Sequence, residues 1–326
     1  MIVDFIKMQG LGNDFLVFNC LSSELLADTI VSVATSLCDR RFGIGADQIL
    51  LLLDSKVRRR TPVNVRRRTP VNVRRRTPVN VRRRTPVSWH TPVKVCGCTP
   101  EDSDFQMRII NADGSEVEMC GNGIRCLAKY IWEAGLSQKD TLDIETLAGT
   151  IRPQRVGKLV KVDMGQPVLE GSLIPTMLTG KVVDHPLKIN GKTFNITCVS
   201  MGNPHTVIFV DDVEGFPVHE YGPIIEKHPF FPKRTNVEFV EIIDSTHIKM
   251  RVWERGANET LACGTGACAA SVVSTIKGFT TGDTNVLLRG GELLIQWQNG
   301  SSVYMTGPSV SVFNGSIDLD RFLGQE

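Results

Sequence analysis

The 326-residue sequence has no long run of apolar residues, no basic N-terminal region and no even set of cysteines. Its longest purely aliphatic run, Ile49–Leu53, is far shorter than the roughly 20 residues that span a bilayer, which excludes a membrane helix. The opening stretch MIVDFIKMQG carries Asp4 and lacks the basic region of a signal peptide, so we expect it to form a first strand. Nine cysteines in a chain of this length indicate free thiols in a reducing cytoplasm, because such a chain needs no disulfides.

The charge of the chain is unevenly distributed. Of its 37 basic and 35 acidic residues, 14 basic and two acidic residues lie within 55–103, so the remainder holds 23 basic and 33 acidic residues. With 41% hydrophobic residues the chain is too long for one ordinary core and long enough for two domains. We therefore expect an acidic, soluble, two-domain protein that carries a basic insertion.

The insertion is a tandem repeat. VRRRTPVN begins at Val57, Val65 and Val73, and VRRRTPVS begins at Val81. The recurring proline excludes a continuous helix, and three adjacent arginines per unit repel one another. We interpret the segment as a disordered or loosely extended loop, because the valines alone cannot form a core for a solenoid. Nucleic-acid binding through the arginines is the alternative, although the segment lacks the interleaved aromatic residues on which bases stack.

Two short motifs occur twice along the chain. A Gly-Asn turn contains Asn13 in GLGNDF and Asn203 in MGNPH, and a Cys-Gly-X-Gly motif contains Cys120 in MCGNGIRCLA and Cys263 in LACGTGACAA. Turn and cysteine are 107 residues apart in the first half and 60 in the second. The difference of 47 is almost the length of the basic insertion. The chain therefore reads as two related domains, the first interrupted by the insertion.

The predicted domains are residues 1–164, with the insertion at about 55–103 and a C-terminal return at 309–326, and residues 165–308. Most of the sequence outside the insertion predicts short strands, because apolar or β-branched runs alternate with turn residues. The predicted strands are Ile2–Met8, Phe15–Asn19, Ile49–Leu53, Gln106–Asn111, Leu142–Thr146, Leu159–Met164, Thr206–Val210, Val237–Ile243, His247–Trp253, Leu293–Trp297 and Val303–Thr306. The predicted helices are Glu24–Ser36, Asn122–Ala134 and Thr265–Lys277.

A cysteine at the start of a helix has a defined chemistry. A free thiol is only about 3% ionised at neutral pH, and the unpaired N–H groups of a helix N-terminus stabilise its thiolate. The same N–H groups bind a carboxylate, and the glycines allow the backbone to approach it. Two such sites facing each other would place a base on one side of a carbon and an acid on the other.

Other interpretations of the cysteines remain. Simple burial accounts for five of the seven cysteines outside the two motifs, Cys20, Cys38, Cys126, Cys198 and Cys268, and the other two, Cys96 and Cys98, lie in the insertion. The spacings C-x₅-C and C-x₄-C are not those of zinc ligands, so we expect no metal. A disulfide between Cys120 and Cys263 stays open, because their similar contexts favour proximity.

Six ordered motifs give the chain a specific resemblance. They are KMQGLGNDF, FGIGADQ, NADGSEVEMCGNGIRC, GNPH, TNVEF and ERGANETLACGTGACAA. Together they resemble the diaminopimelate epimerase family, cofactor-independent amino-acid epimerases of lysine and peptidoglycan precursor synthesis. The resemblance covers nearly everything except about residues 55–103. It implies an α/β (α+β) fold of two pseudo-symmetric domains, each a curled, mainly antiparallel sheet around a central helix, with the active site in the interdomain cleft.

The resemblance also implies site residues. Cys120 and Cys263 correspond to the two catalytic thiols, one removing the α-proton and the other protonating the opposite face. His205 and Glu254 correspond to residues that support the thiols. Backbone N–H groups around Gly121, Asn122, Gly264 and Thr265 would stabilise the carbanion.

The remaining implied residues bind the substrate. Arg255 suits a carboxylate because a guanidinium binds it bidentately, and amide side chains both donate and accept hydrogen bonds. The implied ligand positions are Asn13, Gln48, Asn111, Asn203, Asn236, Glu254 and Arg255.

The resemblance predicts the conversion of LL-2,6-diaminopimelate to the meso form by a cytoplasmic homodimer without a cofactor or metal. The alternatives are a related racemase or isomerase that needs no pyridoxal phosphate and acts on another carboxylic acid, or an inactive scaffold that binds nucleic acid through its arginine repeats. We expect no membrane association.

Overall fold

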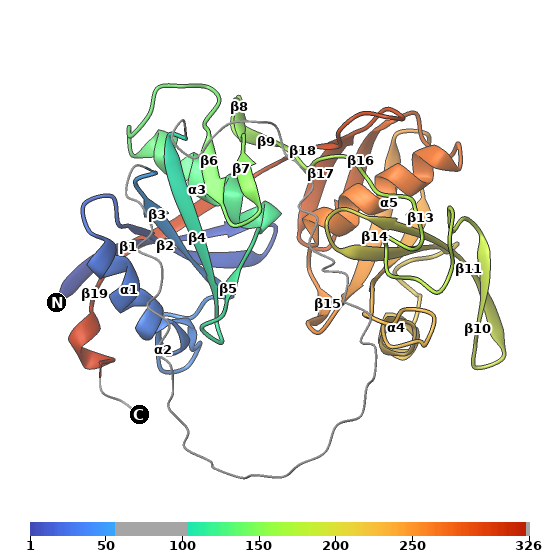
Figure 1. The fold of residues 1–326 in the computed structure, drawn as a ribbon, viewed down its shortest axis with the longest axis horizontal. Helices are drawn as coiled ribbons and strands as arrows, with labels where there is room; N and C mark the ends of the chain where they lie inside the picture. Colours follow the sequence, from blue (N-terminus) through green and yellow to red (C-terminus); the bar gives the residue numbers. More distant parts are fainter. Residues whose placement is uncertain (56–102, 324–326) are drawn as a thin grey trace, which may run out of the picture.

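The structure, a computed structural model, describes residues 1–55 and 103–323. Figure 1 shows two lobes side by side, and in each a sheet curves around one long helix. The VRRRTPVN repeats lie outside the described residues, so the expectation of an extended loop there stays a prediction. Within the described ranges, no helix is both long and apolar enough to cross a bilayer.

The first lobe is an eight-stranded sheet. Its strand order is β19-β1-β2-β3-β4-β6-β7, with β5 beside β4. The last strand, drawn in red in Figure 1, returns from the second lobe to pair with the first strand along its length. The bounds are β1 (Ile2–Gly10), β2 (Asn13–Asn19), β3 (Gln48–Leu53), β4 (Phe105–Asn111), β5 (Glu116–Val117), β6 (Ile144–Thr146), β7 (Gly149–Ile151) and β19 (Val310–Asp318).

The second lobe is an eleven-stranded sheet. Its strand order is β10-β11-β12-β13-β14-β16-β17-β18-β9-β8, with β15 beside β14. The bounds are β8 (Gln154–Val156), β9 (Leu159–Asp163), β10 (His185–Ile189), β11 (Lys192–Ser200), β12 (Pro204–Phe209), β13 (Asn236–Ile242), β14 (His247–Glu254), β15 (Asn258–Thr260), β16 (Asp283–Leu288), β17 (Gly291–Gln296) and β18 (Tyr304–Gly307).

The two sheets share one connectivity. The β2–β3 pair is parallel, β3–β4 is antiparallel and β4–β6 is parallel, and the same sequence of directions holds for β12–β13, β13–β14 and β14–β16. The other strand pairs described are antiparallel. The predicted fold class, two pseudo-symmetric halves with mainly antiparallel sheets, is confirmed.

The central helix of the first lobe, α3, is largely buried. The helix α3 lies inside the first sheet and buries Leu127 and Ile131 completely, so truncation of either to alanine would cost about 2–5 kcal/mol. Gly135, at φ +68°, ends α3, and Gly278, at φ +72°, follows α5. The bounds are α1 (Glu24–Ser32), α2 (Ala34–Cys38), α3 (Gly121–Glu133), α4 (Val218–Glu226) and α5 (Gly264–Ile276), and a 3₁₀ turn covers Leu319–Arg321.

Two helix predictions need correction. The predicted helix Glu24–Ser36 is broken at Val33, which ends α1 and begins α2. A further helix, α4, was not among the predicted helices, and it contains Pro223, a residue that is unfavourable inside a helix. Packing of α4 against β14 and burial of Ile225 stabilise it despite that proline.

The strands that flank the insertion, β3 and β4, pair with each other. In the antiparallel β3–β4 pair, Leu53 lies opposite Gln106. Beyond this pair the Ser55 hydroxyl donates to the carbonyl oxygen of Ser103 at 2.5 Å. The described residues that border the insertion, Ser55 and Ser103, therefore lie next to each other at the end of the β3–β4 pair.

The boundary proposed at residue 164 depends on the criterion. By hydrogen bonding, β8 and β9 belong to the second sheet, since β9 pairs with β18. The side chains of Val160 and Val162 nevertheless pack in the core of the first lobe. Division at residue 164 follows this side-chain packing, and it stays a proposal.

One turn of the first lobe interlocks with the second. Leu11, in the β1–β2 turn at φ +58°, is buried in the core that surrounds α5. A Cβ on Gly290 would lie 2.0 Å from the Leu11 carbonyl oxygen, and one on Gly12 would lie 2.8 Å from Leu261 Cδ1. These glycines let the turn dock tightly, and the docked turn places Asn13 at the junction of the lobes.

Candidate functional site

The two motif cysteines are the N-caps of the two central helices. Cys120 has an extended backbone (φ −138°, ψ 114°), and the Gly123 N–H donates to its sulfur at 3.4 Å. Cys263 has almost the same backbone conformation (φ −122°, ψ 113°) at the start of α5. Each thiol therefore lies at the positive end of a helix, where a thiolate is stabilised.

The N-termini of α3 and α5 adjoin each other at Met305. A Cβ built on Gly121 would lie 3.1 Å from Met305 Cε, and one on Gly264 would lie 3.1 Å from Met305 Sδ. The same Cβ built on Gly264 would lie 3.8 Å from Asn122 Oδ1. The sites of the two lobes thus form one region, and side chains larger than hydrogen at these two glycines would push the helix ends apart.

The thiol of Cys120 lies within an amide cluster of the first lobe. It donates to Asn13 Oδ1 at 3.7 Å, and Asn122 Nδ2 donates to the same oxygen at 3.3 Å. The amide of Asn13 is fixed at its other end, because its Nδ2 donates to Asp47 Oδ2 at 2.9 Å. Burial raises the pKa of Cys120, whereas the N–H groups of Gly123 and Asn122 lower it.

Gln48 and Asn111 form a pair beside this cluster. They lie opposite each other at the ends of β3 and β4, and Gln48 Nε2 donates to Asn111 Oδ1 at 2.8 Å. Gln48 Oε1 is buried and accepts no hydrogen bond from the described residues. That oxygen is an acceptor available for an ammonium group.

The second lobe carries a polar triad behind its helix end. The fully buried His205 contacts Glu238 Oε1 through Nδ1 at 2.7 Å and Asn203 Oδ1 through Nε2 at 2.9 Å. Asn203 Nδ2 in turn donates to Thr265 Oγ1 at 3.3 Å. The two lobes share this contact. In each lobe the asparagine of the Gly-Asn turn contacts the side chain two residues after the motif cysteine, Asn13 contacting Asn122 and Asn203 contacting Thr265.

Carboxylates surround the thiol of Cys263. Burial raises the pKa of Cys263 well above its usual value, and Glu254 and Glu238 raise it further. Burial also raises the pKa of Glu254, although hydrogen bonds from the Thr260 hydroxyl, at 2.5 Å, and the Cys263 thiol oppose this shift. Glu254 is therefore placed to accept the Cys263 proton, and its charge reaches Cys120 as well.

Asn236 and Arg255 have different environments. The buried Asn236 amide is bound to backbone at both ends, donating to the Pro204 carbonyl at 2.8 Å and accepting from the Arg255 N–H at 2.9 Å. Arg255 is exposed, and its guanidinium contacts the Lys233 carbonyl at 3.4 Å. Asn236 is thus placed to hold the backbone of Arg255, while the guanidinium can reach a ligand.

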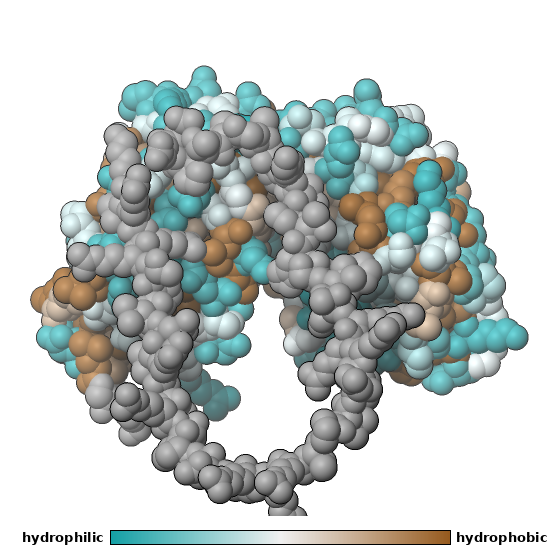
Figure 2. Space-filling view, in the orientation of Figure 1, coloured by the Kyte–Doolittle hydropathy of each residue, from teal (hydrophilic) through white to brown (hydrophobic). Residues whose placement is uncertain are grey.

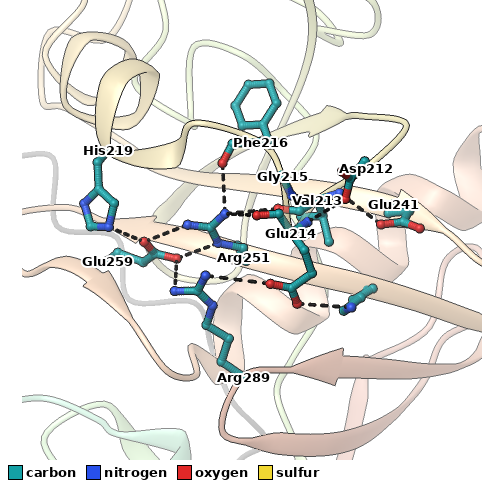
Figure 3. Close-up of polar contacts among 11 residues, drawn as sticks. Asp212, Val213, Glu214, Gly215, Phe216, His219, Glu241, Arg251, Glu259 and Arg289 are labelled. Carbon is teal, nitrogen blue, oxygen red and sulfur yellow. Dashed lines mark hydrogen bonds and ion pairs between the residues drawn. The ribbon is translucent and has the colours of Figure 1, made fainter.

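An ion cluster centred on the buried side chains of Glu259 and Arg251 fixes the strand β15, which precedes Cys263. Figure 3 shows Glu259 bound by His219 at 2.7 Å, Arg251 at 2.7 Å and Arg289 at 2.9 Å. Arg251 Nη1 also donates to three carbonyl oxygens of the loop before α4, at Val213, Glu214 and Phe216. This cluster joins α4, β14 and the β16–β17 turn to the strand that carries Thr260.

The structure therefore brings the predicted residues together in two groups. The first-lobe group is Asn13, Gln48, Asn111, Cys120, Gly121 and Asn122, and the second-lobe group is Asn203, His205, Asn236, Glu254, Arg255, Cys263, Gly264 and Thr265. Sequence reasoning assigned no role to Glu238, Thr260 or Arg125. An acid inside the apolar strand sequence TNVEFVE was the available signal for Glu238.

The five cysteines predicted to be buried, Cys20, Cys38, Cys126, Cys198 and Cys268, have exposures of 0–3%. All seven cysteines within the described residues are free thiols, so the structure contains no Cys120–Cys263 disulfide. Cys96 and Cys98 lie outside the described residues.

Solved structures share this two-lobed fold. The Bacillus anthracis phenazine biosynthesis protein of the PhzF family matches with a TM-score of 0.61 and 14% identity, covering 98% of this chain and 99% of that one. A hydroxyproline epimerase from Agrobacterium vitis matches with a TM-score of 0.58 and 14% identity, covering 98% and 93%. At such identities the likeness concerns the fold, a class of two-domain proteins that includes phenazine-biosynthesis proteins and amino-acid epimerases.

Sequence comparison is more specific than the fold. A family model described as Diaminopimelate epimerase matches residues 91–170 and 197–312. The diaminopimelate epimerase of Moorella thermoacetica is 44% identical over 323 residues, which cover 97% of this chain and 99% of that protein. The chain belongs to the diaminopimelate epimerase family.

Proposed function

We propose that the protein interconverts LL- and meso-2,6-diaminopimelate without a cofactor, with Cys120 and Cys263 as the proton-transfer groups. The observation that supports this most directly is the placement of the two thiols at the adjoining N-termini of α3 and α5. Inversion of an α-carbon requires removal of a proton from one face and delivery of another to the opposite face. Two facing thiols, one of them ionised, meet that requirement.

The two steps conserve the proton count. A cysteine thiolate takes the α-proton and becomes a thiol, and the electron pair left on carbon delocalises into the α-carboxylate. The second thiol then gives its proton to the opposite face and becomes the thiolate. Helix N–H groups around Gly121, Asn122, Gly264 and Thr265 stabilise the carboxylate as negative charge accumulates on it.

Glu254 and His205 support this chemistry in different ways. Glu254 accepts a hydrogen bond from the Cys263 thiol, so we assign it the control of that proton. His205 is fully buried behind Glu238 and Asn203, so we assign it the positioning of both side chains. Direct contact of His205 with the reacting carbon is not required.

The distal end of the substrate carries a second ammonium and carboxylate. The exposed guanidinium of Arg255 suits that carboxylate, and the free oxygen of Gln48 suits an ammonium. The amides of Asn13, Asn111 and Asn203 complete the proposed ligand set. We propose that Asn236 binds indirectly, by holding the backbone of Arg255.

Exchange with solvent tests the function. In deuterated water, LL-diaminopimelate and the purified protein should yield the meso form with deuterium at the inverted α-carbon, without added cofactor and with EDTA present. Substrate and product are followed by NMR and chiral chromatography. Folded protein that produces no meso form and no α-deuterium would refute the proposal. Turnover of trans-4-hydroxy-L-proline in its place would indicate the alternative, a related racemase.

We also propose a homodimer that works in a reducing compartment such as the cytoplasm. The seven free thiols suit such a compartment. The edge strand β19 exposes 45% of Val310, 54% of Val312 and 48% of Phe313, and exposed apolar edge strands favour pairing with another chain. Light scattering should show twice the chain mass for the parent and a shift toward monomer for Phe313→Lys. A monomeric parent at micromolar concentration would contradict the dimer.

A further inference from the structure

The two lobes are alike in backbone but opposite in charge. Counting from the N-cap cysteines, Arg125 on α3 occupies the position that Cys268 occupies on α5. Strand registers likewise align Leu50 of β3 with Glu238 of β13, because Phe15 pairs with Gln48 as His205 pairs with Asn236. The first lobe thus has a cation where the second has a neutral thiol, and an apolar residue where the second has a carboxylate.

Arg125 is buried completely, and no acidic side chain of the described residues pairs with it. Its guanidinium donates to Asn122 Oδ1 at 2.9 Å, the Gly121 carbonyl at 3.1 Å and the Pro308 carbonyl at 3.3 Å. Within residues 1–55 and 103–323, it forms no ion pair. A buried cation without a counter-charge is costly, and it favours an anion that forms nearby.

Two glycines make room for this guanidinium at the junction of the lobes. A Cβ on Gly10 of β1 would lie 3.3 Å from Arg125 Nη2, and one on Gly307 of β18 would lie 3.4 Å from Nε. Met305, which contacts both helix ends, lies 3.6 Å from Nη1 through its sulfur. The arginine is therefore held in a specific enclosure, directly behind the N-terminus of α3.

Arg125 acts on Cys120 by charge and by orientation. Its positive charge lowers the pKa of Cys120, against the dominant effect of burial. By donating to Asn122 Oδ1, it also turns Asn122 Nδ2 toward Asn13 Oδ1, the oxygen that faces the Cys120 thiol. The other titratable groups within reach of this guanidinium are the buried thiols Cys126 and Cys268.

The surroundings of Cys263 carry the opposite charge. Glu254 and Glu238 both disfavour its ionisation, and Thr265 contacts its sulfur at 3.5 Å. His205 contacts Glu238 Oε1 at 2.7 Å and also acts electrostatically on Glu254. Glu254 also acts on Cys120, where Arg125 opposes it.

From this arrangement we propose that Arg125 is a positioning residue that makes Cys120 the first of the two thiols to ionise, and so sets Cys120 as the base and Cys263 as the acid of the singly ionised enzyme. The inference rests on the proposed two-thiol function. It adds the order of ionisation and the residue that determines it.

The order can be measured on the unaltered protein. Initial rates of iodoacetamide alkylation are followed from pH 6 to 10 by mass spectrometry, separately on the peptides that contain Cys120 and Cys263. The pH midpoint of Cys120 should lie at least about one unit below that of Cys263, a tenfold difference in ionisation. A midpoint of Cys263 at or below that of Cys120 would overturn the proposal.

Three variants identify the responsible residue. Arg125→Gln removes the charge but can still donate to Asn122, and it should raise the Cys120 midpoint by about one unit or more with little change at Cys263. Arg125→Lys should restore most of the parent value. Cys268→Ala, at the matched position of α5, should leave the Cys120 midpoint unchanged.

An Arg125→Gln variant with the parent midpoint, or with equal shifts at both cysteines, would show that the arginine is merely structural. These titrations need no turnover, so they are separate from the test of the function. Loss of the proposed function would appear as absent α-deuterium exchange, whatever the two midpoints are. If Arg125→Gln does not fold, the midpoints of the unaltered protein and of Arg125→Lys still decide the order.

Discussion

At the scale of single residues, the two thiols share a backbone setting and differ in their neighbours. Each caps a helix, and each is followed by a glycine three residues on that leaves no space for a side chain. A Cβ on Gly123 would lie 3.1 Å from Leu50 Cδ2, and one on Gly266 would lie 2.9 Å from Glu238 Oε1. The motif residues thus set the helix start, whereas Arg125 on α3 and Glu238 on β13 set the charge beside each thiol.

Removal of either thiol should stop the reaction. Cys120→Ala and Cys263→Ala should each lower kcat by at least about 10²-fold, because each thiol is the proton-transfer group on its face of the carbon. The α-deuterium assay measures the loss. Cys126→Ala and Cys268→Ala change fully buried thiols on the same two helices and should retain most activity. Substantial turnover by the folded Cys120→Ala or Cys263→Ala variant would contradict the two-thiol mechanism.

The activity should rise with pH. Burial raises the pKa of both Cys120 and Cys263, so at neutral pH both are mainly protonated and the active form, with one thiolate, is scarce. Its fraction grows by up to about tenfold per pH unit until the lower of the two pKa values is reached. We expect kcat/KM to increase from pH 7 to 9. A profile that is flat or falls over this range would be inconsistent with buried thiols as the proton-transfer groups.

At the scale of elements, the short strand β15 connects a structural cluster to the site. Its Glu259 is anchored by Arg251 and Arg289 (Figure 3). The adjacent Thr260 donates to Glu254. The ion pairs of Glu259 thereby position Thr260, which in turn positions the carboxylate of Glu254. The cluster contains none of the proposed proton-transfer groups.

Replacement of Glu259 by glutamine should disturb both stability and activity. It leaves Arg251 buried without its counter-charge, which costs about 3–5 kcal/mol of unfolding free energy. We expect kcat to fall as Thr260 loses its anchored position. Urea unfolding and the α-deuterium assay measure the two effects. The matched control Glu214→Gln changes a half-exposed carboxylate of the same cluster and should cost less than about 1 kcal/mol. Equal effects of the two substitutions would rule out the anchoring role.

At the scale of the whole molecule, two lobes with the same strand connectivity contact each other at several points. The Leu11 turn enters the second core, β19 returns to the first sheet, and Met305 contacts both helix ends. Figure 2 shows the two lobes on one face, where a gap separates them in their lower part. The site therefore depends on how the lobes meet, and not on either lobe alone.

The repeat segment should be dispensable for the fold. Joining Asp54 to Asp104 through a short Gly-Ser turn should preserve β3 and β4, because Leu53 already pairs with Gln106 beside that point. We expect soluble protein with activity within about tenfold of the parent, and a pI below neutral because the remainder holds 33 acidic against 23 basic residues. Isoelectric focusing and the α-deuterium assay check both. A folded product without turnover would show that the insertion has acquired a role at the site.

The local pattern of the sequence was sufficient for much of this protein. The duplicated motifs predicted two related halves, and the Cys-Gly-X-Gly spacing placed Cys120 and Cys263 at the starts of α3 and α5. Short apolar runs bounded by turn residues located the strands on both sides of the insertion. These features are encoded within a few neighbouring residues, since caps, turns and strand faces depend on local backbone preferences.

Other features were decided only when distant segments packed together. The helix α4 contains Pro223 and forms because it packs against β14. Leu11 lies in a turn of the first lobe but is buried in the core of the second. The charges at the two thiols come from Arg125, Glu238 and Glu254, which lie on separate elements. The sequence by itself determined which atoms could react, while the tertiary structure determined their ionisation, because burial and the sign of neighbouring charge arise only from packing.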